Sequence, residues 1–225
     1  MNETKKLDCD ICEQISQGTA ISQPPRLTSA SKFVLGFGVA IASIIYGVAI
    51  PFVLPGFRKV CLPYIPATDK QIQNILICLK GRSGALVDLG SGDGRIILSV
   101  MKANGSNNDF NIEKADGVEL NPWLVLYSKY SKWRHRRSIT SGSVSFYKKD
   151  IFKTDLGIYD NIVVFGVEGL MTELECKLEH DLKSNGVLIA CRFPLPNWVP
   201  VLIEGEGIDR VWVYDRTSMI TDTIV

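Results

Sequence analysis

The stretch Leu86–Arg95 reads LVDLGSGDGR, and it constrains the fold more than any other part of the chain. A short apolar run ends in an acid, three glycines alternate with other residues, and the apolar-periodic IILSVMKA follows. This order is typical of a β-strand that leads through a tight turn into an α-helix. The turn has three possible uses: a turn without a ligand, a phosphate cradle, or a cradle for another nucleotide-like cofactor.

Strand and helix patterns alternate along the chain on both sides of this turn. The segments that predict strands are ALVDLG, ADGVEL, SVSFYKK, NIVVFGV, GVLIACRF and a late, partly exposed RVWVYD. Helical periodicity lies between them, and a capping box of Thr68 and Gln71 opens the first helix. Strands that alternate with helices at this spacing predict parallel βαβ units. We therefore expect an α/β fold, a mostly parallel sheet flanked by helices, with its ligand site at the carboxyl ends of the strands.

The front of the chain has a different composition. Residues 33–54 carry no charge, and as a helix they would span roughly 33 Å, about the thickness of the hydrocarbon core of a bilayer. A cleaved signal peptide or a buried soluble helix would also be apolar, but this run is long and follows a polar segment that contains acids. We expect a membrane-anchor or targeting helix. The predicted organisation is a polar, disordered tail 1–31, the hydrophobic helix 32–55, a proline-rich linker 56–67, the main domain 68–215 and a tail 216–225.

Acidic residues follow three successive strands. Asp88 ends the first predicted strand and Asp93 lies in the turn after it, Glu119 ends the second strand, and Asp150 follows the third. Acids around the turn suit a cationic ligand better than a pyrophosphate, and the spacing is GxGxG rather than GxGxxG or a P-loop. Glu119 could accept hydrogen bonds from a ribose diol, and Asp150 from an adenine amino group. The sequence thus favours a nucleoside cofactor that carries positive charge.

With these motifs, residues 66–215 resemble the class I S-adenosylmethionine-dependent methyltransferases. The resemblance implies that VDLGSGDG is the methionine-side loop, that Glu119 in GVELNP binds the ribose and that Asp150 in KKDIF lies beside the adenine. The cofactor-binding residues that we predict are Asp88, Gly90, Ser91, Gly92, Asp93, Glu119, Asn121 and Asp150.

Several further blocks narrow the resemblance. PFVLPGFRKVCLPYIPAT, ELNPWLVLYSKY, FGVEGLM, ACRFPLPNW and GEGIDRVWVYD are similar, in this order, to the mitochondrial protein-lysine methyltransferases of ATP synthase c subunit and adenine nucleotide translocase. The blocks are most similar to those of the members that act on c subunit. The resemblance implies (tri)methylation of a lysine in membrane-embedded c subunit, support of respiratory ATP synthesis, a place in the mitochondrial inner membrane (cristae), and contact with membrane lipid. Adenine nucleotide translocase is the alternative protein substrate.

A methyltransferase of this kind must align a neutral amine with the methyl group. We expect the walls of the substrate pocket at the ends of the fourth and fifth strands. The candidates are Phe193 and Trp198, whose faces would hold the alkyl stem of the amine, and Glu168, which would orient the amine or take its proton. Loop packing explains the two aromatic residues equally well, and a helix N-terminus explains Glu168.

Other chemistries have weaker support in the sequence. The net charge is +1, and FGVEG lacks the DPPY or NPPF pattern of enzymes that methylate base amino groups, so we expect no nucleic-acid partner. The basic stretch KYSKWRHRR stays open to three interpretations: a solvated helix end, RNA contact or contact with anionic lipid. Cys9 and Cys12 form one isolated CxxC, too few ligands for a zinc site, so we predict no metal. A tethered RNA or small-molecule methyltransferase and a non-catalytic scaffold are the competing functions.

Overall fold

The structure is a computed structural model of the 225-residue chain, and it describes residues 28–53, 65–104 and 109–219. The chain divides into two compact units, Met1–Val48 and Ala49–Val225. Most of the predicted polar tail and proline-rich linker, and with them the CxxC, lie outside the described residues.

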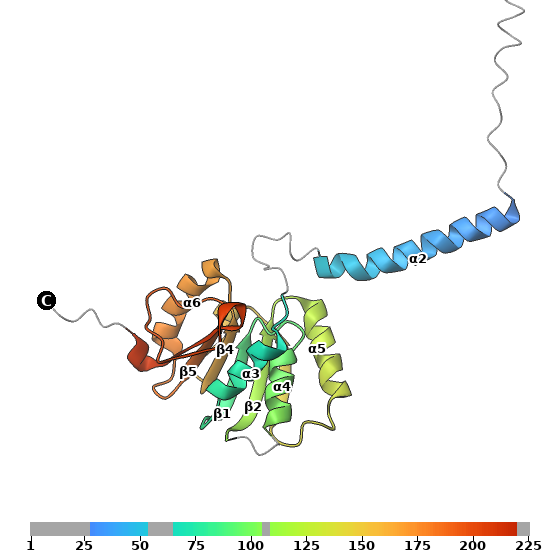
Figure 1. The fold of residues 1–225 in the computed structure, drawn as a ribbon. Helices are drawn as coiled ribbons and strands as arrows, with labels where there is room; N and C mark the ends of the chain where they lie inside the picture. Colours follow the sequence, from blue (N-terminus) through green and yellow to red (C-terminus); the bar gives the residue numbers. More distant parts are fainter. Residues whose placement is uncertain (1–27, 54–64, 105–108, 220–225) are drawn as a thin grey trace, which may run out of the picture. The chain divides into compact units, whose positions relative to one another are not determined.

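The hydrophobic front segment forms a helix, as the sequence predicts. Helix α2 runs over Ser29–Val53 and continues past Pro51 (Figure 1). Its apolar side chains include Val34, Phe37 and Ile44, all of them exposed. Within the ranges that the structure describes, no helix has the length and apolarity needed to cross a membrane, so the prediction of a transmembrane helix at 33–54 is not supported.

The second unit contains a seven-stranded sheet with the order β3-β2-β1-β4-β5-β7-β6. The five strands β1–β5 run parallel, whereas β7 is antiparallel to both of its neighbours. The strands are β1 Ser83–Leu89, β2 Asn111–Glu119, β3 Ser143–Lys148, β4 Asn161–Phe165, β5 Val187–Cys191, β6 Leu202–Glu204 and β7 Val211–Tyr214. The helices are α3 Asp69–Cys78, α4 Arg95–Ala103, α5 Pro122–Arg134 and α6 Glu168–Asp181, with 3-10 turns η2 Ile151–Lys153, η3 Gly207–Asp209 and η4 Arg216–Ser218.

This order is that of a class I methyltransferase fold, and it confirms the predicted α/β class. Two details differ from the sequence prediction. The late strand β7 lies between β5 and β6 and is more buried than expected, because Val211 and Val213 pack into one hydrophobic layer of the sheet and Tyr214 into the other. That outer partner is β6, a strand of three residues that the sequence analysis missed.

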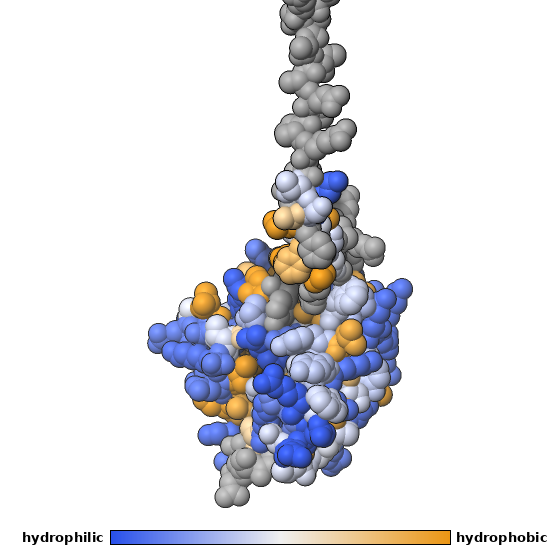
Figure 2. All heavy atoms as spheres, turned by 90° about the vertical axis from the view of Figure 1, so that its right-hand side faces the viewer, coloured by the Kyte–Doolittle hydropathy of each residue, from blue (hydrophilic) through white to orange (hydrophobic). Residues whose placement is uncertain are grey.

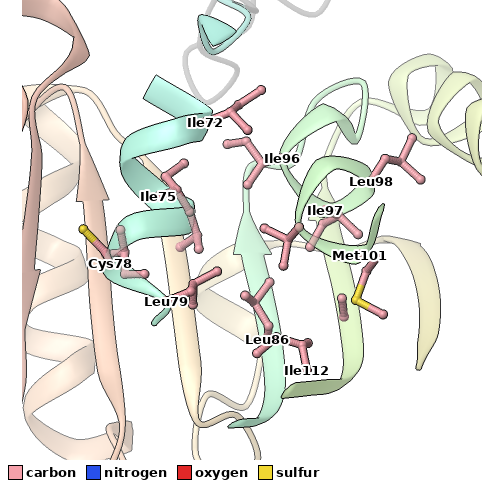
Figure 3. Packing of buried hydrophobic residues seen from close by; sticks show 14 of the residues in the cluster. Ile72, Ile75, Cys78, Leu79, Leu86, Ile96, Ile97, Leu98, Met101 and Ile112 are labelled. Carbon is pink, nitrogen blue, oxygen red and sulfur yellow. The ribbon is translucent and has the colours of Figure 1, made fainter. Parts of the chain in front are cut away.

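Two hydrophobic layers hold the helices on opposite faces of the sheet. On one face, Ile75 of α3 and Ile97 of α4 pack with Leu86 of β1, and the side chains of both helices point toward the sheet (Figure 3). On the other face, Leu174 of α6 packs with Ile162 of β4. Alternate residues of a strand face opposite layers, and the central strands β4 and β5 are buried along almost their whole length, as expected where a sheet is covered on both sides.

Helix α3 is fastened at its start to the turn beside β7. The Thr68 hydroxyl accepts a hydrogen bond from Gln71 N at 3.1 Å, which forms one half of the predicted capping box. The other half is replaced, because Gln71 Nε2 donates to Ile208 O and Asn74 Nδ2 donates to Asp209 O. Polar contacts with η3 therefore hold α3 over the part of the sheet that β5, β7 and β6 form.

The packing of α3 predicts a contrast between two isoleucines of the same helix. Ile75 is fully buried, whereas Ile77 is 42% exposed. Ile75→Ala leaves a cavity and should lower the free energy of unfolding by about 2–5 kcal/mol. Ile77→Ala is the matched control and should change it by less than about 0.5 kcal/mol. Urea unfolding of both variants measures the difference, and equal losses would contradict this packing.

Candidate active site

The predicted cofactor residues meet at the carboxyl edge of the parallel strands. Leu89 pairs with Val118 in β2 and with Val164 in β4, so the turn after β1 lies between Glu119 and Phe165. Asp150 follows β3, whose Lys148 pairs with Glu119. The sheet thus brings together the ends of β1, β2 and β3, as the sequence analysis expected.

Asp88 is the most unusual residue at this edge. Its side chain is fully buried, and both carboxylate oxygens lack a hydrogen-bond partner among the described residues. Burial, and then the negative charges of Glu119 and Asp93, raise the pKa of Asp88 from 3.8 to about 8. A buried carboxyl group without a partner is costly, and such groups are concentrated at functional sites. The group suits a ligand that brings a positive charge or hydrogen-bond donors.

The glycine turn directs its amides inward, toward the protein. Gly90 N and Ser91 N both donate to Val118 O, at 2.9 and 3.0 Å, and Gly94 N donates to Ser91 O. Gly92 N donates to Glu119 Oε2 at 3.1 Å. A phosphate cradle needs these amides free for the anion. Of the three uses of the turn, the geometry therefore disfavours the phosphate cradle.

Open space for a ligand lies at Gly90. Its φ is +79°, and a Cβ built there would meet no atom within 4 Å. The backbone can thus approach a bound molecule at this position without a side chain between them. This opening and the unpartnered carboxyl group of Asp88 lie two residues apart on the same strand end.

Glu119 joins the glycine turn to the start of α5. One of its oxygens accepts from Gly92 N, and the other accepts from Asn121 N at 2.7 Å. Asn121 in turn caps α5, because its Oδ1 accepts from Trp123 N. A carboxylate has about four acceptor positions, so Glu119 retains capacity for the hydroxyls of a ligand.

The two remaining acids are less open than the sequence suggested. Asp93 forms a two-pronged ion pair with Arg95, whose Nη1 also donates to Ala67 O. Its charge is therefore paired and not offered alone to a cationic ligand. Asp150 caps the turn η2 by accepting from Phe152 N at 3.0 Å. Its predicted contact with an adenine stays a prediction.

The substrate candidates come from the opposite half of the same edge. Glu168 is exposed and starts α6, and Phe193 is half-buried in the segment after β5. Trp198 is 5% exposed and packs edge-on against Tyr214, with ring centroids 6.4 Å apart. The structure thus gives Trp198 a packing position and leaves Glu168 and Phe193 nearer to solvent.

Contacts between distant segments hold the stretch 192–198, and sequence reasoning missed them. Glu175 of α6 is buried and accepts from Asn197 N at 3.0 Å and from Asn197 Nδ2 at 2.7 Å. Leu195 N donates to the Tyr214 hydroxyl at 3.0 Å. An acid at an inward position of α6 was the available signal, because a buried charge requires partners.

Arg192 opens this stretch in a rare conformation. Its φ is +74°, a left-handed value that no other described non-glycine residue adopts. Its guanidinium lies 5.9 Å from the ring centroid of Phe165, at the end of β4. Backbone conformations of this kind cost about 1–3 kcal/mol and concentrate at functional sites. Both residues lie at the ends of the fourth and fifth strands, in the segments 165–168 and 192–198 that the sequence predicts as walls of the substrate pocket.

The sequence analysis predicts no metal site. Among the described residues, no cluster of three or more His, Cys, Asp or Glu side chains is arranged to hold an ion. Cys9 and Cys12 lie outside those residues.

The raised pKa of Asp88 predicts that stability depends on pH. In the unfolded chain an aspartate has a pKa of about 3.9, whereas the folded value is about 8. Between these two pH values the folded chain therefore holds a proton on Asp88 that the unfolded chain has released. The free energy of unfolding that Asp88 contributes is fully present below about pH 4, falls as the pH rises, and is lost by about pH 8. Asp88→Asn carries no charge, so its free energy of unfolding relative to wild type should rise by more than ~1 kcal/mol between pH 5 and pH 8. Denaturant titrations at several pH values measure this.

A second variant separates the causes of this shift. Glu119→Gln removes one neighbouring negative charge, so it should lower the folded-state pKa of Asp88. The loss of stability should still begin near the unfolded pKa of about 4, but it should end at a lower pH and be smaller than in the wild type. A constant difference between Asp88→Asn and wild type across the pH range would contradict an elevated pKa.

Comparisons with known proteins agree with this fold and site. Residues 88–202 match the family model described as the ANTKMT methyltransferase domain. Relatives include the ATP synthase c-subunit lysine N-methyltransferases of Homo sapiens, 49% identical over 77% of this chain and 70% of that protein, and of Rattus norvegicus, 42% identical over 93% and 94%. The adenine nucleotide translocase lysine N-methyltransferase of Mus musculus is 42% identical over 72% of this chain and 68% of that protein.

A solved structure supports the fold alone. An RNA methyltransferase from Salinibacter ruber, in complex with S-adenosyl-L-homocysteine, is 20% identical and superposes with a TM-score of 0.57 over 67% of this chain and 92% of that chain. The family match begins at Asp88 and includes the glycine turn, the acids and the stretch after β5. From the family match and relatives of more than 40% identity over most of its length, the chain belongs to the ANTKMT methyltransferase-domain family.

Proposed function

We propose that this chain is an S-adenosylmethionine-dependent protein-lysine N-methyltransferase and that its substrate is ATP synthase c subunit. The ATP synthase c-subunit lysine N-methyltransferases to which this chain is similar match up to 93% of it, and the human one is 49% identical. The observation that carries the proposal is the acceptor-lined turn at Asp88, since the phosphate-binding alternative is disfavoured by the inward amides. The mouse relative that acts on adenine nucleotide translocase makes that protein the second candidate substrate.

The acids of the site fit the proposed cofactor. S-adenosylmethionine, when bound, supplies a methyl group on a positively charged sulfur. Asp88 would accept from its ammonium group, which supplies the donors that the buried carboxyl group lacks. Glu119 would accept from ribose hydroxyls while it holds Gly92, and Asp150 would lie beside the adenine. The other residues of the cofactor set, Gly90, Ser91, Gly92, Asp93 and Asn121, shape and brace this turn.

The other half of the edge would receive the lysine. Phe165 and Phe193 offer ring faces to the alkyl stem, and Glu168 can orient the amine from the start of α6. Arg192 brings a positive charge against Phe165, which disfavours the charged form of a lysine placed beside it. A neutral amine is the form that accepts a methyl group, so this charge would help to keep the lysine reactive.

The place of action that we propose is the mitochondrial inner membrane, with residues 33–54 as the membrane-associated segment. The exposed apolar side chains of α2, among them Phe37 and Ile44, support association with an apolar environment. Fractionation of cells that express the chain tests this, and recovery outside mitochondria would contradict it.

The proposed activity predicts methylation of purified c subunit. The full-length chain with labelled S-adenosylmethionine should transfer label to a lysine of c subunit, and intact mass should increase by one to three methyl groups. Asp88→Asn should weaken cofactor binding by about 10- to 100-fold, because it removes a charge-assisted hydrogen bond. Asp69→Asn, which removes an exposed carboxylate of α3, is the control and should bind as wild type does.

Two outcomes of this experiment would redirect the proposal. Label in adenine nucleotide translocase but not in c subunit would select the second candidate. Label in RNA alone would contradict a protein-lysine methyltransferase.

The buried Glu175 predicts an effect on the protein substrate that spares the cofactor. Glu175→Gln removes one of the two hydrogen bonds from Asn197, because the amide nitrogen of Gln cannot accept, so the stretch 192–198 should be held less firmly. We expect KM for c subunit to rise about 3- to 30-fold, the cost of one hydrogen bond, while the dissociation constant for S-adenosylmethionine changes less than twofold. Glu179→Gln, exposed on the same helix, is the control. A change in kcat and cofactor affinity without a change in KM would contradict this positioning role.

A further inference from the structure

The outer face of α5 carries the residues that a buried helix face would normally hold. Trp123, Leu126, Tyr127, Tyr130 and Trp133 are between 44% and 60% exposed. The buried residues of the same helix are Leu124, Val125, Ser128 and Ser131. The large aromatic residues therefore lie outside while two of the four buried positions are serines, a distribution that packing of the domain alone does not explain.

The exposed rings form a continuous row along the helix. Tyr127 and Tyr130 have centroids 6.5 Å apart, and Tyr130 and Trp133 have centroids 6.0 Å apart. The Arg136 guanidinium extends the row, 5.0 Å from the Trp133 ring. Spacings of three and four residues place these side chains on one side of an α-helix. They therefore make a ridge and not scattered exposed residues.

Positive charge is concentrated on the same segment. Residues 122–137 hold five Lys and Arg and no Asp or Glu, although the whole chain has a net charge of only +1. The five are Lys129, Lys132, Arg134, Arg136 and Arg137. Lys132 Nζ donates to Val144 O at 2.5 Å and Arg136 lies over the Trp133 ring, so Lys129, Arg134 and Arg137 are the exposed charges that remain for an anionic partner. Figure 2 faces the side of the domain on which α5 lies and shows strongly hydrophilic residues interspersed with residues of intermediate hydropathy.

We propose that this outer face of α5 binds the surface of an anionic phospholipid bilayer. Tyr and Trp rings prefer the boundary between headgroups and acyl chains, and Lys and Arg beside them are attracted to anionic headgroups. A helix that presents both along one side lies flat in that boundary. The surface thus matches a bilayer in shape, in hydropathy and in charge.

Single-stranded RNA is the other polyanion that aromatic and basic residues bind, and it fits this face less well. Proteins that bind it use a groove that follows the backbone, with rings free for bases to stack on. Here the surface is a convex ridge, and Tyr130 and Trp133 already face each other. Leu126 is 59% exposed, and its apolar side chain is stabilised by burial among acyl chains, which nucleotides do not provide.

Binding through α5 would also orient the active site. The helix begins at Pro122, three residues after Glu119, and Asn121 N donates to that carboxylate. A bilayer against α5 would thus lie beside the carboxyl edge of the sheet. That edge holds the candidate active site, so a substrate lysine of a membrane-embedded protein would reach the active site from the bilayer surface.

Vesicle binding by the full-length chain tests the proposal. The probes are vesicles of phosphatidylcholine alone and vesicles that also contain phosphatidylglycerol. Binding through α2 is present in both, so the gain on adding the anionic lipid isolates the charge-dependent contact. Lys129→Gln/Arg134→Gln/Arg137→Gln should reduce the affinity for anionic vesicles at least 10-fold and leave the affinity for neutral vesicles within twofold. Lys70→Gln/Lys80→Gln/Arg210→Gln removes three exposed charges elsewhere and should change neither affinity more than twofold.

A second measurement depends on the rings and not on the charges. Brominated acyl chains quench tryptophan fluorescence on contact, so anionic vesicles that contain them should quench the wild type, and Trp133→Phe should lose part of that quenching. Equal binding of the α5 and control triple variants to anionic vesicles would overturn the proposal. A single-stranded polyuridine that displaces the chain from anionic vesicles at nucleotide concentrations below that of the lipid would also overturn it, in favour of RNA. Because the assay contains no cofactor and no ATP synthase, its result is separate from that of the proposed enzymatic function.

Discussion

The carboxyl group of Asp88, buried at the end of β1 without a partner, is the constraint on which the rest of the site depends. A carboxylate in this position is unfavourable, and with Glu119 and Asp93 nearby its pKa rises to about 8. The fold therefore holds a protonated acid at neutral pH in place of a charge. A cationic group that enters beside it would favour the ionised form, so binding and proton release would be coupled. The sheet tolerates this group because the edge at which it lies is also where parallel strands offer space for a ligand.

The glycine turn and Glu119 decide what kind of ligand that space can take. Four amides of the turn donate to protein oxygens, and one of those acceptors is the Glu119 carboxylate itself. The surface that remains is rich in acceptors and poor in donors. Phosphate would need the opposite, whereas an ammonium group and ribose hydroxyls need acceptors. The same carboxylate links the turn to α5 through Asn121, so the ligand-binding edge and the helix that we propose as the lipid contact share one hydrogen-bonded junction.

Local patterns in the sequence were sufficient for the parallel part of the fold and for the position of the acids at the carboxyl edge of its strands. Strand β1, the glycine turn and α4 follow from apolar runs and glycine spacing, because those signals act between near neighbours. The three-residue strand β6 carries too few residues to show a period, and it exists because β7 offers an edge. The pairing of Asp93 with Arg95 was readable from adjacency but was overlooked. Two other contacts join residues from different elements: the ring contact between Trp198 and Tyr214, and the hydrogen bonds from Asn197 to Glu175. No local sequence pattern encodes contacts of this kind.

These differences follow the division of the site into two halves. The cofactor half is made by consecutive βα units, so Asp88, Glu119 and Asp150 each lie within two residues of the end of a strand, where the local sequence pattern places them. The substrate half is made by the stretch 192–198, which has no regular structure and takes its shape from α6 and β7 through Glu175 and Tyr214. A segment fixed by such distant contacts can change its outline without disturbing the cofactor half. Relatives that share the acids could therefore act on different proteins, and Arg192 begins this stretch in a strained conformation beside Phe165.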